Sequence, residues 1–190
     1  MDIKHALLAP HIQRWTVVPT TRRQNIAEHS HSVAMLAGEL YRELVGATRV
    51  EQPVLFQLYA LALWHDMPEV ITGDINSAFK DRLGEGLDQT ESAACPQLLD
   101  MRAAQKHVWQ EVIVKIADQM EAALYISHWM PNRHWRAESA RDFVWGKVEK
   151  LAEAAERAYP QFEWVDAVVR VMERASGFQF DADADTGYNT

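Results

Sequence analysis

Residues 55–69 read LFQLYALALWHDMPE, a nearly unbroken apolar run that ends in His65 and Asp66. Such a run is typical of an α-helix that is buried on most of its faces. A buried imidazole or carboxylate without a partner costs several kcal/mol, so these side chains need a metal ion, another cation or a hydrogen-bonded network. The run therefore predicts a core helix with a polar site at its end, and a metal ion is the simplest occupant.

Glu69 follows one turn later and shares a helix face with both His65 (i+4) and Asp66 (i+3). A carboxylate base can therefore stand beside the ligands of a metal ion. The alternative is that Glu69 only solvates the face of its helix.

Two further polar residues stand in apolar helical stripes. His29 begins a stripe that continues through Val33 and Leu40, so its ring is expected to point inward, whereas His31 lies two residues off that face. Asp118 ends the mainly apolar stretch VKIAD at 114–118 and shares its face with Ala122 and Tyr125. Both side chains are candidates for burial in the core.

The set His29, His65, Asp66 and Asp118 offers two imidazoles and two carboxylates. This mixture suits Zn²⁺, Mn²⁺, Co²⁺ or Fe²⁺ better than Mg²⁺ or Ca²⁺, which prefer oxygen ligands alone. Four protein ligands of this kind would leave positions open for water and a phosphate oxygen. Each residue alone is better explained as an ordinary buried polar group or helix cap, and only the set favours a metal site.

The order His, His-Asp, Asp resembles that of the HD-domain phosphohydrolases. Longer motifs resemble the bacterial 5′-deoxynucleotidase branch of that family: Arg14-Trp15, NIAEHS at 25–30, HDMPEVITGD at 65–74 and KIAD at 115–118. The chain is shorter than that branch between Asp74 and Asp118, and INSAFK at 75–80 replaces a proline-rich stretch. This spacing is closer to that of the small phage enzymes that remove triphosphate from dATP.

The resemblance implies a single compact all-α HD-domain helical bundle with a divalent cation, Zn²⁺, Co²⁺ or Mn²⁺ rather than Mg²⁺. It implies a hydrolase that attacks the α-phosphorus of a 2′-deoxynucleotide. The first hypothesis is a dATP-preferring triphosphohydrolase that releases deoxynucleoside and triphosphate. The second is a 5′-deoxynucleotidase that acts on monophosphates, and the third is a nucleotide-sensing HD module without turnover.

Several residues acquire expected roles from this resemblance. Glu69 would orient the attacking water or pass a proton to the departing 5′ oxygen. Asp74 would be a second catalytic acid or a substrate contact, although it could equally cap the helix that follows. Cations for the phosphoryl group would come from Arg14, Lys80, Lys115 and Arg22, of which Arg22, like Arg23, can equally be a solvated loop charge.

Trp15 is where the resemblance places sugar discrimination. Its ring would fill the space that a 2′-hydroxyl needs and so select deoxyribose. The alternative is a core tryptophan, since the chain has seven tryptophans.

Composition limits the partners. A formal net charge of −8 argues against binding to nucleic acid polymers or anionic membranes, so an anionic nucleotide needs a local positive pocket. The single Cys95 excludes an internal disulfide. The N-terminus lacks a signal-peptide pattern and no apolar stretch is long enough to span a bilayer, so we expect a cytoplasmic enzyme, in the host cytoplasm if it is phage-encoded. The family resemblance favours a homo-oligomer.

The chain reads as helical throughout, with no hairpin signal. Residues 1–177 are expected to form the HD domain, and the acidic, aperiodic residues 178–190 a tail. Thr16 to Ala27 is expected to be a loop, and Asp81 to Asp88 a mobile connection. Helices are expected over 2–14, 28–45, 51–67, 75–83, 89–129 with a break at Cys95-Pro96, 135–158 and 161–175.

Overall fold

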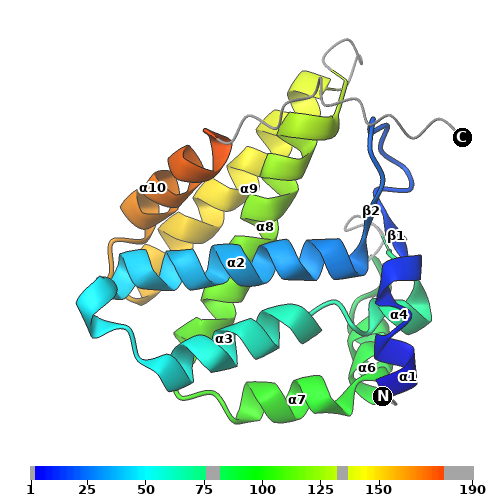
Figure 1. The fold of residues 1–190 in the computed structure, drawn as a ribbon, viewed down its shortest axis with the longest axis horizontal. Helices are drawn as coiled ribbons and strands as arrows, with labels where there is room; N and C mark the ends of the chain where they lie inside the picture. The colour runs from blue at the N-terminus through cyan, green and yellow to red at the C-terminus, as the bar shows by residue number, and fades with distance from the viewer. Residues whose placement is uncertain (1–2, 76–81, 132–136, 178–190) are drawn as a thin grey trace, which may run out of the picture.

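The computed structural model describes residues 3–75, 82–131 and 137–177, and over these ranges the chain is a bundle of α-helices with one two-stranded ribbon (Figure 1). The predicted all-α class is confirmed. In chain order the elements are α1 Ile3–Ala6, η1 Ala9–His11, β1 Gln13–Arg14, β2 Gln24–Asn25, α2 Ile26–Val45, η2 Ala47–Arg49, α3 Gln52–Trp64, α4 Glu69–Thr72, α6 Glu85–Ala94, α7 Pro96–Ala103, α8 Trp109–Trp129, α9 Ala137–Ala158 and α10 Trp164–Ser176.

Helix α2 crosses the middle of the molecule and contacts α3, α8 and α10 (Figure 1). Its start is fixed by a capping box, in which the Asn25 side chain accepts a hydrogen bond from the backbone N–H of Glu28 and the Glu28 carboxylate accepts one from Asn25 N–H. Its buried stripe includes Val33 and Leu40, both fully buried, and His29 lies in the same stripe. The stripe expected from the sequence is therefore the face that packs on the core.

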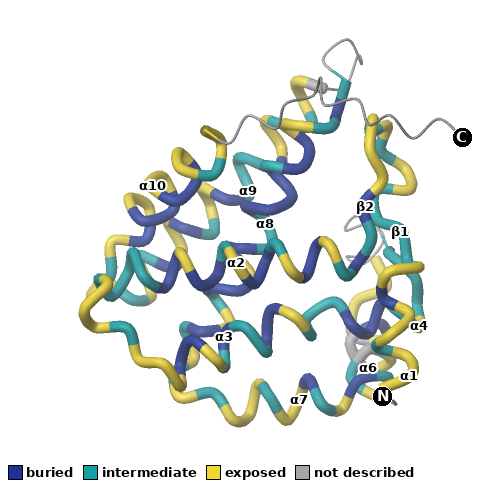
Figure 2. Tube along the Cα trace, viewed as in Figure 1, coloured by how far each residue is buried: buried dark blue, intermediate teal, exposed yellow. Residues whose placement is uncertain are grey.

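The faces that α8, α9 and α10 turn toward one another are buried, and so is the face of α3 that packs on α2 and α8 (Figure 2). Leu58 of α3, Ile116 of α8 and Trp164 of α10 are fully buried among them. Because α2, α3 and α8 pack together, residues as far as 92 positions apart in sequence, such as His29 and Glu121, meet at one place in the core. In the described ranges no helix combines the length and apolar character that crossing a membrane requires.

The N-terminal segment differs from the expected long helix. Pro10, which has no N–H to donate, lies in a short 3₁₀ turn, and the chain then extends into β1. β1 pairs antiparallel with β2, with Gln13 opposite Asn25 and Arg14 opposite Gln24. The predicted helix over 2–14 and the absence of a hairpin were therefore wrong, and the predicted loop ends earlier than Ala27, since α2 begins at Ile26.

The later boundaries are partly as expected. The break at Cys95-Pro96 is confirmed, since α6 ends at Ala94 and α7 begins at Pro96. A second break before Trp109 was missed, because no glycine or proline marks it; there the Gln110 side chain accepts a hydrogen bond from the His107 N–H. The helix expected over 75–83 lies largely outside the described residues, and the connection expected up to Asp88 is helical from Glu85.

Candidate metal centre and substrate pocket

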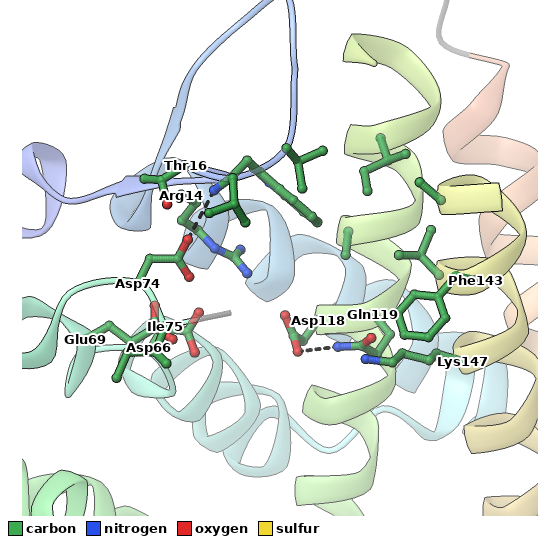
Figure 3. Close-up of a pocket in the computed structure, with 17 residues that line it drawn as sticks. Arg14, Thr16, Asp66, Glu69, Asp74, Ile75, Asp118, Gln119, Phe143 and Lys147 are labelled. Carbon is green, nitrogen blue, oxygen red and sulfur yellow. Dashed lines mark hydrogen bonds between the residues drawn. The ribbon is translucent and has the colours of Figure 1, made fainter. Parts of the chain in front are cut away.

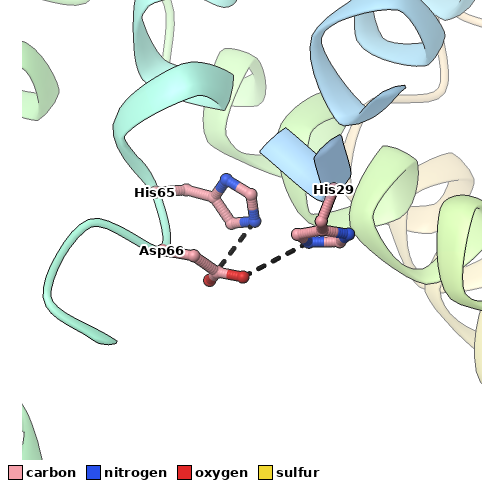
Figure 4. Close-up of side chains that lie close together, drawn as sticks. All are labelled: His29, His65 and Asp66. Atoms are coloured by element: carbon pink, nitrogen blue, oxygen red, sulfur yellow. Dashed lines mark ion pairs between the residues drawn. The ribbon is translucent and has the colours of Figure 1, made fainter. Parts of the chain in front are cut away.

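The packing of α2, α3 and α8 brings the predicted ligand side chains together; Figure 4 shows His29, His65 and Asp66, and Figure 3 shows Asp118. His29 lies on α2, His65 and Asp66 directly follow α3, and Asp118 lies on α8. His29 Nε2 is 3.2 Å from Asp66 Oδ2 and 3.1 Å from Asp118 Oδ1. His65 Nε2 is 3.3 Å from Asp66 Oδ1 and 4.0 Å from Asp118 Oδ1. One donor atom from each of His29, His65 and Asp66 lies within 4.8 Å of the other two.

Both imidazole rings point Nε2 toward the carboxylates of Asp66 and Asp118. His29 Nδ1 is 2.7 Å from Glu121 Oε2, and His65 Nδ1 is 2.6 Å from the Ala62 carbonyl oxygen. Because a carboxylate and a carbonyl only accept, each Nδ1 carries the proton and donates it. The lone pair of each neutral ring is then on Nε2. Both Nε2 atoms are buried and make no hydrogen bond of acceptable geometry.

The charges of the cluster favour a cation. Burial and the Arg14 charge oppose protonation of His29, but Asp118, Asp66 and Glu121 outweigh them and raise the pKa of His29 well above its usual value. Burial would raise the pKa of Asp118, yet its interactions with His29 lower that pKa to about 2. Asp66 likewise has a pKa well below its usual range, despite burial, because His65, His29 and Arg14 surround it. Both aspartates are therefore ionised at neutral pH.

These observations fit a divalent metal ion. Two buried Nε2 atoms and two ionised carboxylates converge at one place, and the negative field that favours a proton on His29 Nε2 would also favour a metal cation there. Nitrogen and oxygen donors in this ratio suit Zn²⁺, Co²⁺ or Mn²⁺.

The cluster borders a cavity of about 640 Å³ (Figure 3). Its acidic end is lined by Asp66, Glu69 and Asp118. The opposite wall is apolar and is formed by the β1–β2 ribbon and α9 as well as α8; it includes Val17, Val18, Ala122, Ile126, Ala140, Phe143 and Val144. The volume and the division into a charged end and an apolar wall are typical of a small-molecule site.

The Arg14 side chain lies between the acidic end of the cavity and its apolar wall (Figure 3). Burial would lower the pKa of its guanidinium, but the carboxylates of Asp66, Asp118, Glu121 and Glu69 outweigh burial and raise that pKa above its usual value. The guanidinium therefore keeps its positive charge. Its Nη1 lies 3.8 Å from Glu121 Oε2, and Nε and Nη1 are buried without a hydrogen-bond partner. A largely buried cation with donors available is suited to bind an anionic group of a ligand.

Glu69 and Asp74 both line the cavity. Glu69 is the first residue of α4 and is only 3% exposed. The helix expected over 51–67 ends at Trp64, so Glu69 does not share one helix face with His65 and Asp66 as expected; the turn at 65–68 nevertheless brings it to the cavity beside Asp66. Asp74 Oδ2 accepts a hydrogen bond from the backbone N–H of Trp15 at 3.1 Å, whereas the helix that Asp74 could cap lies largely outside the described residues.

Trp15 is half-buried at the cavity wall rather than in the centre of the core. Its φ of +60° lies in the left-handed region that side chains other than glycine rarely adopt, and such strain persists only where surrounding contacts enforce it. The indole stacks on Tyr125 with ring centroids 5.7 Å apart and planes within 5°. Trp15 is thus an aromatic ring held in a fixed place at the cavity wall.

The remaining predicted cations are placed differently. Lys80 lies outside the described residues. Lys115 is exposed and does not line the cavity, because it points away from the core side of α8. Arg22 is exposed, pairs with Glu28 at 3.1 Å and covers the ring of Trp129. Roles in substrate binding for these three residues stay predictions.

Sequence reasoning missed Glu121, Gln24 and the α9 residues Phe143 and Lys147. Glu121 follows Asp118 by three residues and is flanked by Met120 and Ala122, so a carboxylate on the buried face of α8 was a signal that could have found it. Phe143 and Lys147 could not be found in this way, because their helix carries many exposed charges and nothing local relates it to the cavity.

Glu121→Gln is expected to raise the Kd for Zn²⁺ roughly 10- to 100-fold, the usual effect of losing the carboxylate that orients a metal-binding histidine. Competition with a chromophoric chelator measures this. Glu111→Gln, an exposed position on the same helix, is the matched control and should leave the Kd unchanged. An unaltered Kd in Glu121→Gln would show that the His29 contact does not serve metal binding.

The helical bundle and the cluster of His29, His65, Asp66 and Asp118 match the class of helical phosphohydrolases of the HD type, in which the chain has its relatives. The sequence profile described as 5′-deoxynucleotidase YfbR-like matches residues 7–130, and the chain belongs to that family.

Among similar proteins are two phage enzymes named dATP triphosphohydrolase. The one from Salmonella phage PMBT28 is 34% identical over 98% of this chain and 91% of its own length. The one from Acinetobacter phage SH-Ab 15497 is 30% identical over 86% of each chain. A solved structure, the Cyanophage S-2L HD phosphohydrolase (DatZ) bound to dA and one catalytic Zn²⁺ ion, matches the fold with a TM-score of 0.77 at 24% identity, covering 93% of this chain and 97% of that one.

Proposed function

We propose that this protein hydrolyses 2′-deoxynucleoside triphosphates, dATP in preference, to deoxynucleoside and triphosphate. The observation that carries this proposal is the His/Asp cluster opening into one cavity whose walls include Arg14 and Trp15. Two relatives named dATP triphosphohydrolase support the choice of substrate, since the similarity to them extends over most of the chain.

His29, His65, Asp66 and Asp118 would hold the metal ion. Zn²⁺ is the first choice, in line with the ion named in the Cyanophage S-2L structure, and Co²⁺ and Mn²⁺ suit the same donors. Once bound, such a cation lowers the pKa of a coordinated water toward neutrality and polarises a phosphoryl oxygen.

The chain's own residues supply the rest of the chemistry. Arg14 binds the phosphoryl oxygens and offsets the charge that builds on them. The water oxygen bonds to the α-phosphorus, the bond from that phosphorus to the 5′ oxygen breaks, and the 5′ oxygen gains a proton. Glu69, buried next to Asp66, accepts the proton of the water and delivers one to the departing 5′ oxygen.

Hydrolysis of dATP in ¹⁸O-labelled water tests this proposal. The expected products are deoxyadenosine and triphosphate, with the label in the triphosphate and none in the 5′-hydroxyl. Cleavage of dAMP alone would replace this function with the second candidate, a 5′-deoxynucleotidase, which the description of the matching family profile favours. Binding of dATP without any product would leave a nucleotide-sensing module.

Trp15→Ala is expected to remove sugar discrimination. Steric exclusion of one hydroxyl by an apolar wall is worth a ratio of roughly 10² in kcat/KM, so the dATP-to-ATP ratio should fall from about that value toward 1. Steady-state kinetics with both nucleotides measures the ratio. Trp145→Ala, at a half-buried tryptophan outside the cavity, is the control, and an unchanged ratio in Trp15→Ala would exclude Trp15 as the sugar wall.

We further propose that the protein acts as a homo-oligomer in the cytoplasm, that of the host if it is phage-encoded, on a small-molecule substrate and not on nucleic acid polymers or membranes. Phe56 and Leu63 are 71% and 43% exposed on α3, and contact with a second copy would remove these apolar surfaces from water.

A further inference from the structure

A continuous chain of hydrogen bonds joins the indole of Trp15 to the imidazole of His29. Trp15 Nε1 donates to Gln24 Oε1 at 3.0 Å, and Gln24 Nε2 donates to Glu121 Oε1 at 2.6 Å. The other oxygen of the same carboxylate, Oε2, accepts the Nδ1 proton of His29 at 2.7 Å. Gln24, Glu121 and His29 are all buried, so water does not compete for these bonds.

The orientation of the Gln24 amide is fixed from both sides. An indole N–H can only donate, so it requires the amide oxygen, and an ionised carboxylate can only accept, so it requires the amide nitrogen. Glutamine meets both demands at once. Glutamate would place a second carboxylate against Glu121, and methionine of similar length would satisfy neither partner.

The β1–β2 ribbon places Gln24 where it can do this. Gln24 lies directly opposite Arg14 in the antiparallel pair, so the two side chains point to the same face. Arg14 approaches Glu121 from that face as well. One carboxylate of α8 therefore holds the histidine of the cluster, lies beside the buried arginine and, through Gln24, holds the tryptophan.

Three contacts of Trp15 each fix a different part of the position of its ring. The backbone is held by the bond to Asp74, and the plane of the ring is held by the stack on Tyr125. Stacking leaves a ring able to slide within its own plane, because the interaction varies little with small lateral shifts. The directional bond to Gln24 is the contact that fixes the indole within that plane.

We propose that Gln24 is a specificity-positioning residue, which holds the indole of Trp15 at a fixed place relative to His29 and so excludes the 2′-hydroxyl of ribonucleotides. This inference rests on the proposed function for its substrate. It assigns no chemical step to Gln24, which acts through Trp15.

Calorimetric titration of the Zn²⁺-loaded protein with deoxyadenosine and with adenosine tests this without requiring turnover. In Gln24→Met the ratio of the two affinities is expected to fall roughly 3- to 10-fold, the effect of one lost hydrogen bond. Gln24→Asn keeps the amide but is too short to bridge both partners, so it should lower the affinity ratio by a similar factor. Gln13→Met is the matched control, since Gln13 is half-buried on the paired strand and has no part in the chain of bonds; its ratio should equal that of the unaltered protein.

Two measurements separate this role from general support of the fold. In indole-¹⁵N spectra the Trp15 signal, identified by its loss in Trp15→Phe, should exchange with solvent slowly in the unaltered protein and faster in Gln24→Met. In the Trp15→Phe background, which lacks the N–H, adding Gln24→Met should change the affinity ratio less than twofold.

An affinity ratio that is unchanged in both Gln24 variants, or one that falls equally in the Trp15→Phe background, would overturn the inference. Failure of the proposed function is seen separately, as the absence of products from every nucleotide, and does not affect the affinity ratio or the indole exchange.

Discussion

Asp118→Ala should bind Zn²⁺ far more weakly and should lose hydrolysis of dATP by a factor of about 10³ or more. Asp118 Oδ1 lies 3.1 Å from His29 Nε2, and its other oxygen is held by a 2.8 Å hydrogen bond from Gln119. Without this carboxylate α8 contributes no donor to the cluster. A bound metal contributes several kcal/mol to the stabilisation of the transition state, which corresponds to a rate factor of this order.

The loss should not come from unfolding. Asp118 is partly exposed to the cavity, and alanine is a strong helix former, so helical content by circular dichroism should be retained. Equilibrium dialysis against Zn²⁺ and the rate of triphosphate release are the two measurements. Asp100→Ala, at an exposed position on α7, is the control and should preserve both. Full activity in Asp118→Ala would contradict the assignment of this aspartate as a ligand.

Glu69→Gln should lower kcat for dATP by about 10² to 10⁴ while the Kd for Zn²⁺ changes little. The range is the usual contribution of a positioned general acid or base. Glutamine has the same shape as glutamate and keeps the hydrogen-bonding ability needed at a position that is 3% exposed, but it cannot accept a proton from water at neutral pH.

Single-turnover kinetics together with the Zn²⁺ titration distinguish this role from metal binding. A variant that loses Zn²⁺ as well as activity would make Glu69 a ligand, and one that keeps its kcat would remove it from the chemistry. Glu111→Gln, on the exposed side of α8, serves again as the control with unaltered kcat and Zn²⁺ affinity.

The sequence alone predicted the helical class and the residues that now lie around one point, and the reason is local. His29 shares a helical period with Val33 and Leu40, and His65 and Asp66 end an apolar run, so burial could be inferred from spacing. A buried titratable side chain needs a partner, and this requirement selected the four candidates from a chain with eight histidines and 27 acidic residues.

The features that were missed depend on contacts between distant segments. The ribbon of Gln13–Arg14 with Gln24–Asn25 has only two residues in each strand, which is too short for an alternating pattern. Its loop is attached to the end of α8, where Thr21 N–H donates to the Trp129 carbonyl at 2.8 Å. Such a contact, across 108 positions, leaves no periodic trace in the sequence, and neither does the bond between Gln24 and Glu121.

The cavity wall from α9 has a consequence for how enzymes of this family diversify. Ala140, Phe143, Val144 and Lys147 border the ligand space, yet they lie beyond residue 130, where the family profile ends. The reactive end and this wall are thus encoded in separate parts of the gene. Substitutions in the later part can therefore reshape this wall without replacing any residue of the His/Asp cluster.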